Sequence, residues 1–158
     1  GWLRAEGEAL RIKLTHTHHI IYALLVLAMA ASAAPATDSP NTVIIQELND
    51  STVNESIAQH PFFILNVYKK ICNPCQRMKV ALDELSRELD GQAAFGMING
   101  RNNQRTESGY NITSYPTLLV FDNGTLIDKI PGFASKKYIV DRLRMKNANL
   151  DTSLVSYT

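Results

Sequence analysis

Residues 62–75 read FFILNVYKKICNPC, an apolar run that leads into two cysteines separated by two residues. A near-continuous apolar run of this length is typical of a central strand that is buried on both faces of a parallel sheet. Cys72 and Cys75 are the only cysteines of the 158-residue chain. A disulfide between them would stabilise the fold little, because so short a loop removes little entropy from the unfolded chain. The spacing therefore indicates a reactive pair that closes and reopens a disulfide ring.

The sequence after Cys75 changes to helical spacing. Apolar side chains recur every three or four residues at Met78, Leu82, Leu85 and Leu89. This pattern predicts a helix whose first turn holds Pro74 and whose end is marked by Gly91. Cys72 would then lie at the helix N-terminus, where the helix dipole favours a thiolate.

The rest of the pattern predicts an α/β fold. Strands are expected at residues 43–48, 62–68, 93–98, 117–121 and 126–130, with helices before His60, after Pro74, within 101–109 and after Ser135. Residues 49–51 are expected to cap the first helix and Ser135 the last, in which Tyr138, Ile139 and Leu143 would face inward and Lys136, Lys137, Arg142 and Arg144 outward. Residues 122–125, Asp-Asn-Gly-Thr, form a turn sequence, so the last two strands are expected to pair as an antiparallel hairpin. Parallel crossovers followed by a terminal hairpin give a central mixed five-stranded sheet flanked by about four helices.

Several of these features together resemble the thioredoxin family over residues 43–143. They are the apolar strand that leads to the CNPC motif of residues 72–75, the helix after it, the Tyr-Pro-Thr sequence at 115–117, and the hairpin followed by Gly132. The resemblance implies the thioredoxin fold and thiol-disulfide exchange. It also implies a cis proline at Pro116 beside the sulfurs, with the backbone of Tyr115 free to pair with an extended substrate.

Roles for the site residues follow from this resemblance and from the helix geometry. Cys72 is expected to attack a substrate disulfide, and Cys75, one turn into the helix and less exposed, to resolve the mixed disulfide. Lys69 and Lys70 would favour the thiolate of Cys72, or would form only a solvated loop. Substrate contacts are expected at Ile71, Pro74, Tyr115 and Pro116. The dipeptide between the cysteines lacks a histidine, which favours a reductant or electron relay over an oxidant.

Three positions depart from the family pattern. Asn66 stands where the family usually buries an Asp that takes the proton of the resolving thiol, and an amide cannot act as a base. Ile71 replaces a Trp and so removes an aromatic contact surface. Met97 stands where a Lys often accompanies that Asp, so both members of a buried charge pair are absent together. The departures at Asn66 and Ile71 leave a second hypothesis open: a non-catalytic module that binds extended peptide at the Tyr115-Pro116 groove, with the cysteines as a redox switch or relic.

Charge and ligand arguments exclude other classes of function. From Pro35 onward thirteen Lys and Arg balance thirteen Asp and Glu, so this part of the chain lacks the basic footprint of a nucleic-acid-binding domain. A closed zinc site needs two ligands besides Cys72 and Cys75, and residues 35–158 contain no second CxxC and only one histidine, His60. We therefore expect no nucleic-acid partner, no metal and no cofactor, and we expect protein disulfides or dithiols as substrates.

The first 34 residues carry a separate signal. Residues 1–19 include basic side chains and lead into a mostly apolar segment, 20–34, that ends in small residues. This order is typical of a cleaved export signal. A membrane anchor is the alternative, although fifteen helical residues span only about 22 Å of a hydrocarbon core of about 30 Å.

These signals give the expected organisation of the chain. A leader at 1–34 and a linker at 35–42 would precede a thioredoxin domain at 43–147 and a tail at 148–158. The leader predicts an exported, extracytoplasmic protein, which we expect to be a monomer. A reductant in an oxidising compartment would need an upstream electron donor, for which a membrane protein is a candidate.

Overall fold

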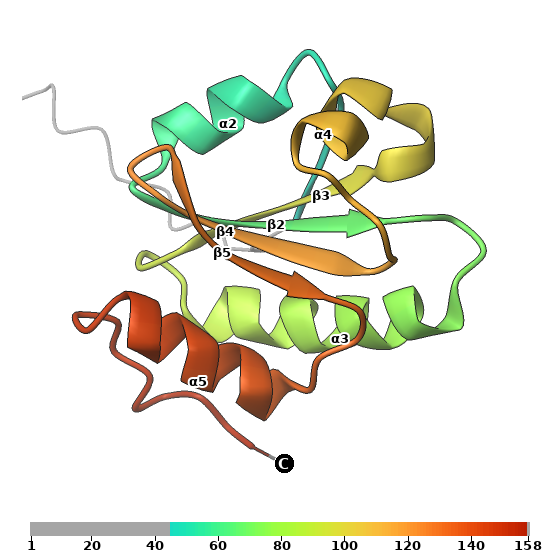
Figure 1. Ribbon diagram of the computed structural model, residues 1–158. Helices are drawn as coiled ribbons and strands as arrows, with labels where there is room; N and C mark the ends of the chain where they lie inside the picture. Colours follow the sequence, from blue (N-terminus) through green and yellow to red (C-terminus); the bar gives the residue numbers. More distant parts are fainter. Residues whose placement is uncertain (1–44, 158) are drawn as a thin grey trace, which may run out of the picture. The chain divides into compact units, whose positions relative to one another are not determined.

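The computed structural model describes residues 45–157, which fold into a five-stranded mixed sheet with helices on both faces (Figure 1). In chain order the elements are β1 (Gln46–Leu48), α2 (Val53–Gln59), β2 (Phe62–Tyr68), α3 (Asn73–Glu88), β3 (Ala94–Asn99), the short 3-10 helix η1 (Gly100–Asn102), α4 (Gln104–Gly109), β4 (Thr117–Asp122), β5 (Thr125–Pro131) and α5 (Lys136–Lys146). The predicted sheet with its four α-helices is confirmed. The leader at 1–34 and the linker at 35–42 lie outside the described residues.

The strand order is β1-β3-β2-β4-β5, with β2 at the centre. β1 and β2 both pair in parallel with β3, whereas β4 pairs antiparallel with β2 and with β5. All of β2 is buried apart from the partly exposed Tyr68, as its apolar sequence predicts. Of the strand predicted at 43–48, residues 46–48 form β1, and residues 43 and 44 lie outside the described residues. The carboxyl end of β2 thus leads directly from the centre of the sheet to the cysteines.

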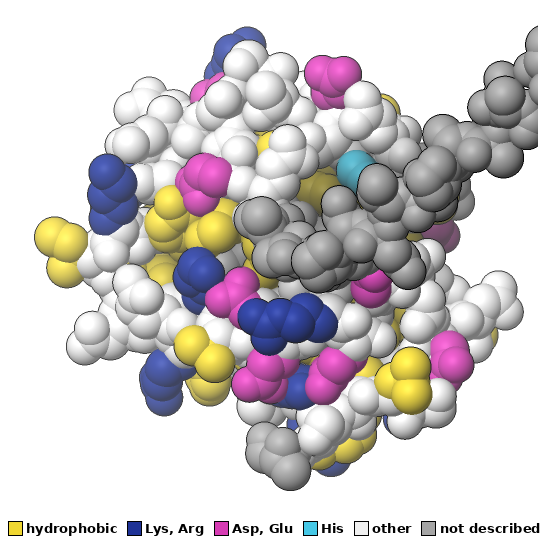
Figure 2. Space-filling view, turned by 180° about the vertical axis from the view of Figure 1, so that it is seen from behind, with side chains coloured by type: hydrophobic (Ala, Val, Ile, Leu, Met, Phe, Trp, Pro, Cys, Tyr) yellow, Lys and Arg dark blue, Asp and Glu magenta, His cyan; other side chains and the backbone are white. Residues whose placement is uncertain are grey.

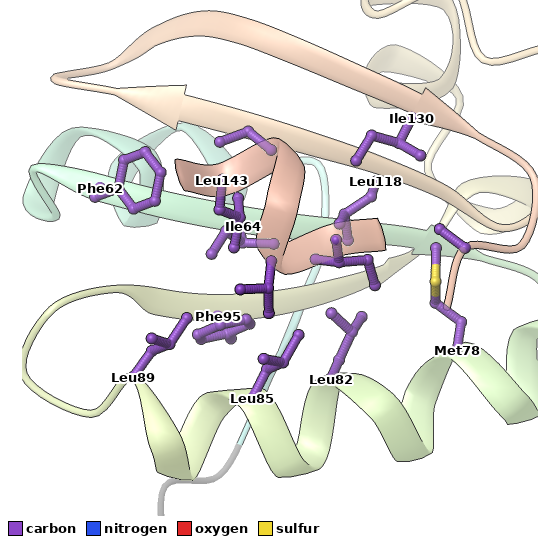
Figure 3. Close-up of a cluster of buried hydrophobic side chains, with 14 of the residues drawn as sticks. Phe62, Ile64, Met78, Leu82, Leu85, Leu89, Phe95, Leu118, Ile130 and Leu143 are labelled. Carbon is purple, nitrogen blue, oxygen red and sulfur yellow. The ribbon is translucent and has the colours of Figure 1, made fainter. Parts of the chain in front are cut away.

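Two hydrophobic layers fill the space between the sheet and its helices. Successive side chains of a strand point to opposite faces. Ile64 accordingly packs with the core under α3 and α5, and Leu65 with the core under α2. In Figure 3 the leucines of α3, Leu82 and Leu85 among them, point at the strands, and both are essentially fully buried. A side chain of this size stabilises the fold by about 1.5–3 kcal/mol when it is buried.

Helix α3 begins and ends where its sequence predicts. Cys72 is its N-cap, and the Cys72 Sγ accepts a hydrogen bond from the Cys75 amide at 3.2 Å. Pro74 lies in the first turn, where the absence of an N–H costs no helical hydrogen bond. The chain leaves the helix through Gly91, whose φ of +75° suits glycine. The cap therefore places both sulfurs at the positive end of a sixteen-residue helix.

Helix α5 contacts α3 through Lys136, a cation that the sequence pattern places in solvent. Tyr138 is 49% exposed, so its expected inward position is wrong, and Val140 is buried instead. Lys136 was expected to face outward, but its side chain is only 13% exposed. Its ammonium binds Glu84 at 3.0 Å and Glu88 at 2.8 Å, both on α3. Helical periodicity cannot reveal such a pair, because it depends on how two helices pack.

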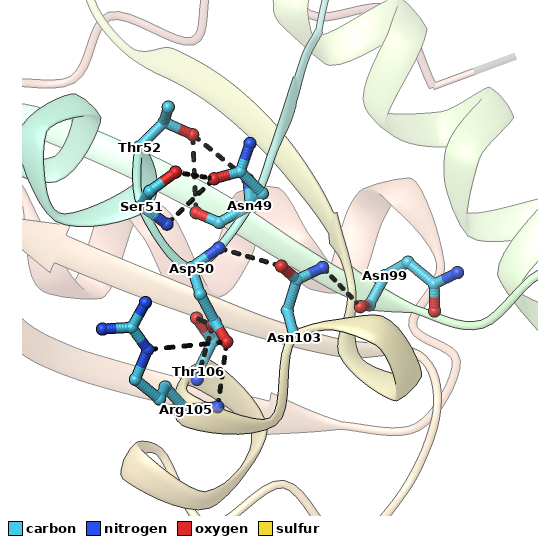
Figure 4. A network of polar contacts seen from close by, with 8 residues as sticks. All are labelled: Asn49, Asp50, Ser51, Thr52, Asn99, Asn103, Arg105 and Thr106. Atoms are coloured by element: carbon cyan, nitrogen blue, oxygen red, sulfur yellow. Dashed lines mark hydrogen bonds and ion pairs between the residues drawn. The ribbon is translucent and has the colours of Figure 1, made fainter.

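A polar network joins the loop before α2 to helix α4 (Figure 4). The Asp50 carboxylate accepts hydrogen bonds from the Thr106 amide at 2.9 Å, from the Thr106 hydroxyl at 2.6 Å and from the Arg105 amide at 3.1 Å. The Asp50 amide donates to Asn103, which in turn donates to the Asn99 carbonyl. Burial raises the pKa of Asp50, but the bonds from Thr106 and Arg105 outweigh it and hold the pKa below its usual value.

The residues after α5 complete the core. Leu150 and Val155 are buried in the layer that α3 and α5 share. Gln92 and Asp151 exchange two hydrogen bonds, at 2.9 Å and 2.6 Å, which tie this segment to the loop before β3. No helix within residues 45–157 is both long and apolar enough to cross a bilayer.

Candidate active site

Cys72 and Cys75 form a disulfide at the start of α3, with their Cα atoms 5.2 Å apart. Cys72 is partly exposed, whereas Cys75 is buried, with 4% of its surface accessible. The expectation that Cys75 is the less exposed of the two is therefore confirmed. One sulfur is open to a protein partner and the other lies behind it, which suits a two-step exchange of disulfides.

The second wall of the site comes from the loop before β4. The Tyr115-Pro116 peptide bond is cis, as predicted, and Pro116 is buried. The Tyr115 carbonyl oxygen lies 4.0 Å from the Cys72 Sγ. Within residues 45–157 neither the amide nor the carbonyl of Tyr115 takes part in a backbone hydrogen bond. The main chain of Tyr115 can therefore pair with an extended segment laid across the disulfide.

The Tyr115 side chain fixes this loop from the other side. Its hydroxyl donates a hydrogen bond to Glu107 on α4, and burial together with Glu107 raises the pKa of Tyr115 to about 12. Its ring lies so close to Gly100 that a Cβ there would come within 2.8 Å of it, so glycine is required. The phenol is therefore protonated at neutral pH, and its hydrogen bond and packing fix its position.

Cationic and apolar side chains lie close to the cysteines in sequence or against the ring of Tyr115. Ile71 is 94% exposed, and Phe133 is 43% exposed. The Arg77 guanidinium stacks 4.4 Å from the Phe133 ring centroid. Lys69 lies 5.8 Å from the ring centroid of Tyr115, and Arg101 lies at the same distance from it. Lys70 and Pro74 complete this surface, the first exposed and the second partly buried.

A cavity of about 320 Å³ adjoins Cys75 between β2 and α3. Asn66 lines it, is 1% exposed, and has a side-chain carbonyl oxygen without a hydrogen-bond partner among the described residues. Met97 pairs with Asn66 in the sheet and lines the same cavity, so these two departures from the family pattern are neighbours. Glu47 is the one carboxylate in the lining, and it accepts a hydrogen bond from the Tyr68 hydroxyl at 2.8 Å.

The buried polar groups that line this cavity are neutral, so no buried ion pair lies beside Cys75 among the described residues. Burial and Glu47 raise the pKa of Tyr68 to about 12, so the phenol stays neutral. An amide and a thioether line the cavity at Asn66 and Met97, whereas its charged side chains are partly or fully exposed: Glu47, Lys69, Lys70 and Lys79. A larger hollow of about 500 Å³ lies near His60 at the other end of β2, away from the disulfide, and contains none of the predicted site residues.

The structure gathers the predicted residues in two groups. Cys72, Cys75, Pro116 and the backbone of Tyr115 form the disulfide site, with Ile71, Pro74, Lys69 and Lys70 at its edge; Asn66 lies below it in the cavity. Sequence reasoning missed Arg77, Arg101, Glu107 and Phe133. Only their contacts with Tyr115 or with each other mark them, and no local pattern reports those contacts. The described residues hold no cluster of three or more His, Cys, Asp or Glu that could bind a metal ion.

Known proteins share part of the sequence. A family model described as Thioredoxin matches residues 44–145. The thioredoxin of Buchnera aphidicola is 33% identical over 93 residues, which are 58% of this chain and 86% of that protein. The thioredoxin of Staphylococcus haemolyticus is 30% identical over 99 residues, which are 63% of this chain and 94% of that protein.

Solved structures share the fold at lower identity. A thioredoxin mutant from Halobacterium salinarum superposes with a TM-score of 0.61 at 19% identity, covering 66% of this chain and 91% of that one. Plasmodium falciparum thioredoxin gives a TM-score of 0.58 at 22% identity, covering 65% of this chain and 98% of that one. The expectation of a thioredoxin fold is confirmed.

Proposed function

The chain belongs to the thioredoxin family of thiol-disulfide oxidoreductases, and from this we propose that it reduces disulfides of other proteins through Cys72 and Cys75. The observation that carries the proposal is the position of the Cys72 sulfur. It lies at the N-terminus of α3, accepts a hydrogen bond from the Cys75 amide, and faces the Tyr115 carbonyl. Helix dipole and amide both favour the thiolate that must attack.

The proposed reaction starts from the dithiol form of the protein. The Cys72 thiolate attacks one sulfur of a substrate disulfide; the substrate S–S bond breaks, a mixed disulfide forms, and the released substrate thiolate takes a proton from water. Cys75 then loses its proton, and its thiolate attacks the Cys72 sulfur. The mixed disulfide breaks, the second substrate thiol leaves, and the Cys72-Cys75 disulfide seen in the structure remains. Two electrons pass to the substrate.

The cavity beside Cys75 bears on the second step. Asn66 can orient a water molecule through its carbonyl oxygen but cannot accept the thiol proton as a base. A cavity of about 320 Å³ has room for water, which occupies about 30 Å³ per molecule in the liquid. We infer that solvent takes the proton of Cys75, so resolution of the mixed disulfide is slower here than it would be with a carboxylate at position 66.

The direction of exchange and the compartment are parts of the same proposal. The Asn73-Pro74 dipeptide has no histidine that would stabilise the reduced form, which supports a reductant or electron relay. The leader at 1–34 supports a place outside the cytoplasm, and such a reductant would act as a monomer re-reduced by an upstream dithiol, with a membrane protein as candidate donor.

Insulin reduction coupled to dithiothreitol tests the exchange function. We expect the wild-type chain to accelerate precipitation of the insulin chains, and the Cys72→Ser variant to fall to the rate without protein. The Cys75→Ser variant should accumulate covalent adducts with substrate proteins, because the mixed disulfide cannot be resolved. A Cys72→Ser variant as active as wild type, or a Cys75→Ser variant without adducts, would leave a peptide-binding module as the better reading.

Equilibration with glutathione tests the direction. Quantifying the dithiol and disulfide forms at fixed glutathione ratios gives the reduction potential of the pair. A reductant should lie near the value of about −270 mV known for thioredoxin, whereas a value near the −120 mV or so of a strong oxidant would overturn the proposed direction.

A further inference from the structure

We propose that the surface around the disulfide selects protein substrates whose reactive cysteine is flanked by acidic residues. This inference rests on the proposed exchange function and adds to it a substrate class. The surface is formed by four cations, Lys69, Lys70, Arg77 and Arg101, which we call the basic rim.

The cations of the basic rim differ from most others in how they are paired. Lys79, Lys136, Lys137 and Arg142 each bind a carboxylate within 3.0 Å, and Figure 2 shows Lys and Arg side chains beside Asp and Glu across one face of the molecule. No member of the basic rim makes an ion pair with any residue of the range 45–157. Four positive charges are therefore left for a partner.

Aromatic rings, not carboxylates, position three of these cations. Arg77 stacks 4.4 Å from the Phe133 centroid, and Lys69 and Arg101 each lie 5.8 Å from the Tyr115 centroid. A cation that lies over the face of an aromatic ring makes no conventional hydrogen bond to it. Its N–H donors therefore remain available to a partner. Lys69 and Arg101 thus lie against the ring of Tyr115, the residue whose carbonyl oxygen is 4.0 Å from the Cys72 sulfur.

The nearest carboxylates are engaged elsewhere. Glu107 accepts a hydrogen bond from the hydroxyl of Tyr115, and Glu47 accepts one from that of Tyr68. Both carboxylates keep their charge but make no ion pair with the rim, whose four cations outnumber them. The sequence from Pro35 onward is neutral, so the positive charge at this site is a local excess and not a property of the whole domain. A positive patch on a neutral protein attracts and orients a partner of opposite charge at that patch.

Two exposed apolar side chains, Ile71 and Phe133, accompany these charges. Ile71 is 94% exposed next to Cys72, and the 43% exposed ring of Phe133 lies under Arg77. The complement of this surface is a protein segment with Asp or Glu on both sides of its disulfide and an apolar side chain close to it. Each exposed charge pair is worth about 1.4- to 5-fold in affinity, so several together give a preference on the order of 10-fold.

Reduction of two matched peptides tests this selection. Both carry the same fluorogenic disulfide and the same lengths, one with Glu and Asp flanks and the other with Ser and Gln flanks, and kcat/KM is measured with dithiothreitol as electron source. We expect the acidic peptide to be reduced about 10-fold faster at 20 mM NaCl, with the ratio approaching 1 at 0.5 M NaCl, where the Debye length falls well below 10 Å.

Charge reversal identifies the residues responsible. The Lys70→Glu/Arg101→Glu variant should invert the ratio of the two peptides, and the matched variant Lys146→Glu, an exposed cation in the last turn of α5, should leave it unchanged. Using the ratio cancels any change in the reactivity of Cys72 itself. Equal rates for both peptides in the wild type, or an unchanged ratio in the double variant, would overturn the substrate class alone. A wild-type chain that reduces neither peptide would overturn the exchange function beneath it.

Discussion

The polar network around Asp50 and the surroundings of the disulfide treat their polar groups in opposite ways. At Asp50 the carboxylate, its own amide and the side chain of Asn103 all have partners within the chain. Around the disulfide, the side-chain carbonyl oxygen of Asn66 has no partner among residues 45–157, and no cation of the basic rim forms an ion pair with a carboxylate of that range. In the first region the hydrogen bonds hold a loop to a helix. In the second, the donors and acceptors remain available to substrate or water.

This difference separates residues that stabilise the fold from residues that serve exchange. A buried polar atom without a partner costs about 1–3 kcal/mol. Residues 45–157 hold three such atoms, on Asn66, Asn99 and Glu88, and only that of Asn66 borders the cavity beside Cys75. Changes in the Asp50 network should therefore alter stability and leave exchange intact. Changes around the disulfide should alter exchange, with or without a change in stability.

Removing the Asp50 carboxylate should give the largest loss of stability. Asp50→Ala leaves two donors of Thr106 and the Arg105 amide without their acceptor, and we expect the free energy of unfolding to fall by about 3 kcal/mol. Urea unfolding at pH 7 measures it, with Asp83→Ala, which breaks only a partly exposed pair within α3, as the control at about 0.5 kcal/mol. Equal effects of the two substitutions would contradict the comparison.

The same network should give stability a defined dependence on pH. Because the pKa of Asp50 is lower in the folded protein, its contribution is fully present above the unfolded value of about 3.9 and is lost as the pH falls through the folded value. The difference in unfolding free energy between wild type and Asp50→Asn should therefore shrink from pH 6 to pH 2.5. A difference that stays constant over that range would show that the carboxylate charge is not what the network stabilises.

A carboxylate placed beside Cys75 should lower the free energy of unfolding less than loss of the Asp50 carboxylate does. The pH dependence of its effect should have the opposite sign. Asn66→Asp puts a charge at a site that is 1% exposed, so burial should raise its pKa and lower stability at pH 7 by about 2 kcal/mol. Since a raised pKa gives stability that is lost as the pH rises, the variant should be more stable relative to wild type at pH 5 than at pH 8. Urea unfolding at both values measures this.

A paired charge provides the control for that substitution. Met97 is the sheet partner of Asn66, so Met97→Lys should recover about 1–2 kcal/mol when combined with Asn66→Asp, and it should destabilise the wild-type background. Exchange should respond as well: the Asn66→Asp variant should resolve the mixed disulfide faster, because a base now lies beside Cys75. No coupling in the double-mutant cycle would mean that the two side chains do not share the cavity.

The sequence predicts one of these regions better than the other, for a physical reason. The buried strand β2, the amphipathic helix α3 and the hairpin turn are local patterns, and each matched its element within a few residues. The cysteine pair and Pro116 were also found, because spacing and family resemblance mark them. Arg101 and Glu107 were not, since each acts through the Tyr115 ring, which the fold brings to them from another part of the chain.

The helix caps show the same limit at short range. Ser135 caps α5 as predicted, through a hydrogen bond from the Tyr138 amide. At α2 the side chains of the expected cap residues at 49–51 do not cap the helix: the Asn49 side chain accepts from the amide of Ser51, and the N-cap position falls later, on Thr52. Asp50, whose sequence position suggests a cap, is drawn to α4 by Thr106. Competing partners far along the chain decide such cases.

The smallest stability effect is expected at the most exposed residue of the site. Ile71→Ser removes a side chain that is 94% exposed and packs on nothing, so the free energy of unfolding should change by less than about 0.5 kcal/mol. The rate of insulin reduction should nevertheless fall severalfold, because Ile71 would be the first apolar contact with a protein substrate, while reduction of the disulfide by dithiothreitol should not change. Leu154→Ser, a 76% exposed residue of the C-terminal segment, should leave both rates unchanged. If the two serine variants reduce insulin equally fast, Ile71 is only an exposed apolar residue, and contact with the substrate must come from Phe133 and the backbone of Tyr115.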